Sequence, residues 1–140
     1  MSSLAAQKAT AKAVIAGFDA WKLEKIMAYR HPDCQIQVIP ASLGRPKMNN
    51  AEYRVRLAHI MPWFRNFKAT VHTEVHDAEA HTCMIHATST AETDIGPYAN
   101  EYALILTFTE DGTKVINFLE MVDSAYSSKF FAALAEAGLK

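Results

Sequence analysis

Two long strand-like segments near the end of the chain, residues 98–109 and 113–123, constrain its fold more than any other feature. The residues between them include Asp111-Gly112, and Asp-Gly between two apolar runs strongly favours a β-hairpin. Apolar residues occupy both alternating sets of positions, so both faces of this hairpin need to be covered. We therefore expect a sheet that lies between other layers of the protein.

The remaining periodicities predict an α+β chain whose first helices precede a long antiparallel meander. Asn49, with Glu52 three residues later, predicts the N-cap of a helix that Pro62 kinks or ends. The apolar stripe of this helix is Tyr53, Leu57, Ile60, Met61 and Phe64, and Glu52, Arg56 and His59 are expected away from that stripe. The other predicted elements are helices over 4–20 and 21–29, strands over 33–40, 67–77, 81–94, 98–109 and 113–123, and a final helix capped by Ser124.

Composition narrows the class of protein. The chain has 140 residues, which favours a single domain over residues 1–140, and its net charge is −1. No Lys/Arg cluster or long apolar run is present, so we expect no nucleic-acid partner, no membrane span, no secretory signal and a cytoplasmic location. Cys34 and Cys83 lack metal-ligand spacing and are expected to be reduced and buried.

Polar residues inside the predicted hairpin indicate where function lies. Glu120 stands within Phe-Leu-Glu-Met-Val, where burial would raise the pKa of its carboxyl toward neutrality. Tyr98, Asn100 and Tyr102 share one face of the preceding strand. A carboxylate facing two phenols and an amide outlines a pocket with acid–base chemistry, although a purely structural polar network remains an alternative.

The two-sided apolar pattern also bears on assembly. Helices can cover one face of the sheet, and in a single domain a second copy of the chain is the simplest cover for the other. We therefore expect a homodimer that forms through the outer face of the sheet.

The order of elements resembles the cone-shaped fold of nuclear transport factor 2 and the SnoaL-like polyketide cyclases. Within that superfamily the chain resembles fungal natural-product enzymes, namely the skeletal isomerases of meroterpenoids and a semipinacolase-type isomerase of indole alkaloids. The resemblance is carried by residues 31–34, 40–44, 49–53, 89–93, 95–98, 100–102 and 122–124, and thus spans nearly the whole chain.

This resemblance implies a deep apolar pocket between sheet and helices, with no metal and no organic cofactor. Matching the family's motif residue by residue assigns four catalytic positions, Glu120, Tyr102, Tyr98 and Arg30. The candidate substrate-binding residues are Asn100, His31, Phe118 and His86.

The sequence thus predicts a cofactor-independent isomerase or cyclase that rearranges a polycyclic meroterpenoid-type intermediate by an acyl shift, lactone formation or ring expansion. The alternatives are a semipinacolase or cyclase acting on an alkaloid or polyketide, a dehydratase, and a binding module without chemistry. Asp123 is expected to be either a helix cap or a catalytic group. His72 and His76 are four apart on a strand, too distant to share a metal ion.

Overall fold

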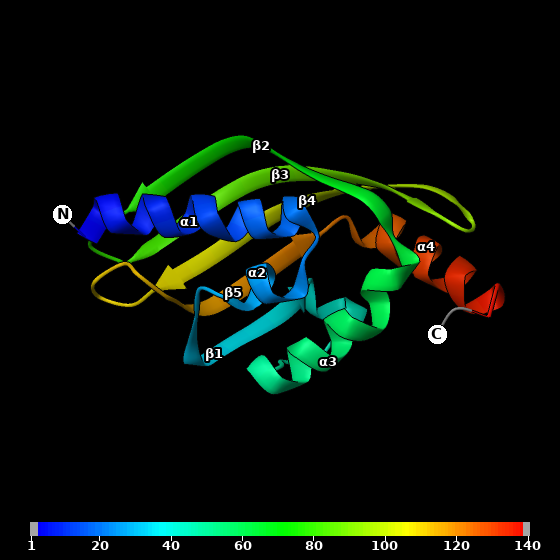
Figure 1. Cartoon of the computed structure of the whole chain (residues 1–140), viewed down its shortest axis with the longest axis horizontal. Helices are drawn as coiled ribbons and strands as arrows, with labels where there is room; N and C mark the ends of the chain where they lie inside the picture. The colour runs from blue at the N-terminus through cyan, green and yellow to red at the C-terminus, as the bar shows by residue number, and fades with distance from the viewer. Residues whose placement is uncertain (1–2, 139–140) are drawn as a thin grey trace.

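The computed structural model describes residues 3–138, which form a five-stranded sheet and a set of covering helices (Figure 1). In chain order the elements are α1 (Ser3–Ala20), α2 (Leu23–Met27), β1 (Arg30–Ile39), the 3-10 helix η1 (Ala41–Leu43), α3 (Asn50–Ile60), the 3-10 helix η2 (Met61–Trp63), β2 (Arg65–Asp77), β3 (Thr82–Thr93), β4 (Gly96–Phe108), β5 (Val115–Val122) and α4 (Ser124–Glu136). The expected α+β class is confirmed.

The strands follow the order β1-β5-β4-β3-β2. Strands β2 to β5 form the predicted antiparallel meander, whereas β1 pairs with β5 in parallel, so the sheet is mixed rather than antiparallel throughout. Figure 1 shows β2 and β3 bending strongly, with α1 lying across the long strands, α3 beside β1, and α4 at the end of the sheet where β5 finishes. The helices and the concave side of the sheet therefore face each other.

The core fills the space between α1, α3 and the inner face of the sheet. Its side chains with no more than 1% exposure include Ala11, Ile36, Ile85, Leu106 and Phe118. Cys34 and Cys83 are also buried there as free thiols, as expected. Burying these apolar surfaces is the main stabilising contribution, at roughly 25 cal/mol per Å².

Several element boundaries differ by one to three residues from those predicted, most clearly at the second helix and the first strand. The second helix ends at Met27, and the first strand starts at Arg30 rather than at residue 33. Pro32 lies inside this strand because β1 is at the edge of the sheet and its register with β5 is irregular between Arg30 and Gln35. A proline lacks a backbone N–H and is tolerated at such a position.

The caps of the later helices follow from local hydrogen bonds. Asn49 and Glu52 form the predicted capping box, with both backbone-to-side-chain bonds at 2.9 Å. The α-helix ends at Ile60, and Pro62 falls in η2, as predicted. The cap of α4 is Asp123 rather than Ser124, because the Asp123 carboxylate accepts from the Tyr126 N–H at 3.1 Å. Asp123 is thus a helix cap.

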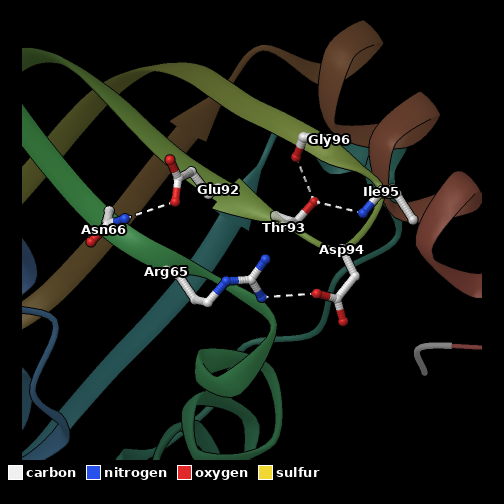
Figure 2. Close-up of polar contacts among 7 residues, drawn as sticks. All are labelled: Arg65, Asn66, Glu92, Thr93, Asp94, Ile95 and Gly96. Atoms are coloured by element: carbon white, nitrogen blue, oxygen red, sulfur yellow. Dashed lines mark hydrogen bonds and ion pairs between the residues drawn. The ribbon is translucent and has the colours of Figure 1, made fainter.

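The turn between β3 and β4 sets where the polar strand β4 begins (Figure 2). The Thr93 hydroxyl donates to the Gly96 carbonyl at 2.7 Å and accepts from the Ile95 N–H at 3.3 Å. Figure 2 also shows two contacts that tie the start of β2 to this end of the hairpin, Arg65 with Asp94 at 2.9 Å and Asn66 with Glu92 at 2.7 Å. These contacts fix the backbone two residues before Tyr98.

Candidate active site

A cavity of about 540 Å³ lies between the inner face of the sheet and the helices. This volume is within the usual range for pockets that take small molecules. Apolar side chains from nearly every element line it, including Ile15, Phe18, Trp21, Val38, Leu43, Met48, Leu57, Ile60, Phe64, Phe67, Leu104, Phe118, Val122 and Phe131. Polar side chains also line it, and these are the candidates for chemistry.

A row of hydrogen-bonded side chains crosses the sheet wall of this cavity. The Asn100 amide Nδ2 donates to the Ser127 hydroxyl at 2.9 Å and to the Tyr98 hydroxyl at 2.8 Å. The Tyr98 and Tyr102 hydroxyls lie 3.2 Å apart, and the Tyr102 hydroxyl lies 2.6 Å from the Ser89 hydroxyl. Strand register explains the arrangement, because Ser89 is directly opposite Asn100 on the paired strands β3 and β4.

One backbone contact determines which groups donate and which accept along this row of hydrogen bonds. The Asn100 carbonyl oxygen Oδ1 accepts from the Glu101 N–H at 2.9 Å, so the other amide atom is the donating nitrogen. The Tyr98 oxygen therefore receives a hydrogen bond and keeps its own proton for Tyr102 or for a group in the cavity. Burial raises the pKa of both phenols, and the nearby charge of Glu120 raises each further. Both tyrosines are thus neutral donors near pH 7.

Glu120 faces the same cavity from β5, between Val38 on β1 and Leu104 on β4. Its side chain is half-buried, and within residues 3–138 no group donates a hydrogen bond to its carboxylate. Burial raises the pKa of this carboxyl to about 7, against the opposing charges of Arg30 and Arg45. The group therefore exchanges a proton readily near neutral pH.

Arg30 is close to this site but does not line the cavity. Its guanidinium lies over the rings of Tyr53, at 4.5 Å, and Phe118, at 5.3 Å, and both rings do line the cavity. Its Nη1 donates to the Cys34 sulfur at 3.7 Å, and its buried Nε has no partner among the residues described. Arg30 is therefore not a lining residue, and its charge lowers the pKa of Glu120 from behind the aromatic wall. A catalytic role for Arg30 stays a prediction.

Two of the four predicted substrate-binding residues lie at the cavity, and two do not. Asn100 and Phe118 line the cavity. His31 lies outside it, in a shallow depression beside the β4–β5 turn, and its Nδ1 accepts from the Asp33 N–H at 3.0 Å. His86 is on the outer face of the sheet, where its Nε2 lies 2.6 Å from Glu101. A place at the cavity is therefore wrong for both histidines, because strand alternation and the edge position of β1 turn them away.

Sequence reasoning missed several polar lining residues. Ser89 had no predicted role of its own, yet its hydroxyl lies 2.6 Å from that of Tyr102. Arg56 was expected away from the apolar stripe of α3, but it lines the cavity one turn after Tyr53. Arg45, in the loop after η1, lines the cavity too. The i, i+3 spacing from Tyr53 could have indicated Arg56, whereas nothing in the sequence places the loop.

Across residues 3–138, no cluster of three or more His, Cys, Asp or Glu side chains has the geometry to hold a metal ion. The helices in that part of the chain are too short or too polar to cross a membrane.

The curved sheet, the covering helices and the polar row in an apolar cavity define a SnoaL-like protein with the nuclear transport factor 2-like fold. No protein-family model matches the chain. A monooxygenase of Pestalotiopsis fici, ptaG, is 34% identical over 133 residues, which cover 94% of this chain and 92% of the relative. The chain belongs to the same family as this fungal protein, within the SnoaL-like group.

Solved structures agree with this assignment. The BvnE pinacolase of Penicillium brevicompactum has a TM-score of 0.91 at 26% identity, and the match covers 95% of this chain and 96% of that one. PrhC of Penicillium brasilianum also has a TM-score of 0.91, at 25% identity, covering 99% and 93%. The cavity described above therefore belongs to a fold that fungal natural-product enzymes use.

Proposed function

We propose that the protein is a cofactor-independent isomerase or cyclase that rearranges a polycyclic natural-product intermediate by acid–base chemistry. The observation that carries this proposal is the half-buried Glu120 carboxyl, with a pKa of about 7, facing Tyr98 and Tyr102 in one apolar cavity. The likeness to the BvnE pinacolase supports it. A meroterpenoid-type intermediate remains the preferred substrate class, followed by an alkaloid or a polyketide.

Glu120 supplies the proton transfer. A carboxyl with a pKa near the working pH is populated in both forms, so it can remove a proton from a hydroxyl or an activated carbon and return it elsewhere. The lack of a hydrogen-bond donor to it among the described residues leaves its oxygens available to a substrate. The positive charge of Arg30, behind the aromatic wall of the cavity, keeps the pKa of Glu120 from rising further.

The two phenols supply stabilisation of an oxyanion. Asn100 donates to the Tyr98 oxygen, and Ser89 can donate to the Tyr102 oxygen, so both phenol protons are free to face the cavity. Two donors 3.2 Å apart fit a developing enolate or alkoxide. Removing one preorganised donor of this kind typically costs about 3–4 kcal/mol in the barrier.

A second candidate function is oxygenation without a cofactor, because the relative ptaG is named a monooxygenase. It would begin with the same proton abstraction. An enolate so formed can react with dioxygen, as when anthrone and O₂ give anthraquinone and water. The two functions thus share Glu120 and differ in whether O₂ is consumed.

The test uses two probes, 2-tetralone in D₂O and anthrone under air, in place of the natural substrate. We expect the protein to catalyse deuterium exchange at the tetralone α-carbon, followed by NMR, with no O₂ uptake on anthrone. Glu120→Gln should abolish the exchange and Tyr102→Phe should slow it by roughly 100-fold, whereas Glu110→Gln, in the exposed β4–β5 turn, should not change it. Unchanged exchange in Glu120→Gln would refute the acid–base role, and ¹⁸O incorporation from ¹⁸O₂ would favour the oxygenase.

We also propose that the protein is a homodimer formed through the outer face of the sheet. Val75 and Met84 are directly paired on this face and are 58% and 47% exposed, and Met121 further along it is 38% exposed. Exposed apolar rows of this kind favour association.

A further inference from the structure

Two arginines line the cavity without an acidic partner. Arg45 comes from the loop after η1 and Arg56 from α3, and both side chains are half-buried. Burial lowers the pKa of Arg56, and the positive charge of Arg45 is close enough to lower it further. Placing two like charges together in a mostly apolar wall is unfavourable unless an anion joins them.

Two arginines on the outer surface, unlike Arg45 and Arg56, have acidic partners. Arg54 is paired with Glu24, and Arg65 with Asp94. The guanidiniums of Arg45 and Arg56 form no ion pair or hydrogen bond with any residue from 3 to 138. The guanidinium of Arg45 instead lies over the Phe131 ring at 5.6 Å. The hydrogen-bond donors of both guanidiniums are therefore available to a bound molecule.

The other charges at the cavity do not cancel this pair. Glu120 is the one carboxylate among the described lining residues, and Arg30 opposes its charge from behind the Tyr53 and Phe118 rings. Near pH 7 the wall therefore carries an excess of positive charge at Arg45 and Arg56. A cavity that binds only a neutral hydrocarbon skeleton does not need this excess positive charge.

We propose that the cavity takes a substrate bearing a carboxylate, which Arg45 and Arg56 hold while the apolar body of the substrate reaches Glu120 and the tyrosines. The planar guanidinium fork matches a carboxylate and binds it more strongly than neutral donors do. The bound anion would also fix which carbon of the skeleton faces Glu120. This inference rests on the proposed function in placing the substrate in this cavity, but binding alone can test it.

The test compares anthracene-2-carboxylate with its methyl ester by fluorescence titration at about pH 7. We expect the acid to bind at least 10-fold more tightly than the ester, since hydrogen bonds to a charged carboxylate are stronger than those to a neutral ester. Arg45→Gln and Arg56→Gln should each remove most of this preference and leave the affinity for the ester unchanged. Arg54→Gln, two residues away on the exposed side of α3, is the matched control and should keep it.

Equal affinity for acid and ester overturns the proposal, as does a loss of both probes alike in Arg56→Gln when its thermal unfolding is unchanged. The outcome is separable from that of the proposed function. Glu120→Gln should keep or strengthen binding of the acid, because it removes the one negative charge in the described wall, even though turnover is lost.

Discussion

The pKa of Glu120 predicts that Glu120→Gln stabilises the protein at alkaline pH. The folded protein raises this pKa from an ordinary value of 4.5 to about 7, because burial disfavours the charged carboxylate more than Arg30 and Arg45 favour it. The folded state thus binds the proton more tightly than the unfolded chain. The stabilisation is fully present below about pH 4.5 and is lost as the pH rises through about 7.

The magnitude follows from the same two values. At 1.36 kcal/mol per pH unit, the loss reaches about 3 kcal/mol once the folded protein is fully ionised. Most of it develops between about pH 5 and pH 8. The value is an upper limit, since the carboxylate is only half-buried and water in the cavity screens it. The glutamine side chain of the variant does not titrate, so the stability of the variant lacks this contribution.

The measurement is urea unfolding of the wild type and Glu120→Gln at about pH 5 and pH 8. We expect the free energy of unfolding of the variant to exceed that of the wild type by about 2 kcal/mol more at the higher pH than at the lower. Other titrating groups cancel in this comparison. A stability difference that is the same at both pH values would mean that the Glu120 carboxylate is ionised throughout this range, contrary to our reasoning.

Two further predictions concern packing and assembly. Gly112→Ala should destabilise the protein by roughly 2 kcal/mol or more, since φ is +77° and the added Cβ would lie 2.5 Å from a backbone oxygen of α1. Gly44 also has a positive φ, +69°, but open space lies around it. Gly44→Ala should therefore cost only about 1 kcal/mol in the same urea titration. Light scattering at micromolar concentration should give twice the mass of one chain; Met84→Asp should halve it, and Val55→Asp on α3 should not. A monomeric wild type would contradict the proposed dimer.

Local patterns accounted for much of the fold. The Asp111-Gly112 hairpin, the Asn49 capping box and the ending of α3 near Pro62 depend on residues that are near in sequence, and all three are present. The parallel pairing of β1 with β5 was not predictable in this way. It joins segments that lie far apart along the chain, and no turn residue specifies it.

The sequence by itself determined that Tyr98, Asn100 and Tyr102 share one face of a strand and that Glu120 lies on its neighbour, because side chains alternate along strands. Only the tertiary structure decided which other groups meet them. Packing of α3 and the η1 loop over the sheet brought Arg45 and Arg56 into the cavity, and the edge position of β1 placed Arg30 behind the wall and His31 outside it. Periodicity fixes the face on which a residue lies, whereas the layer that covers that face depends on contacts between distant segments.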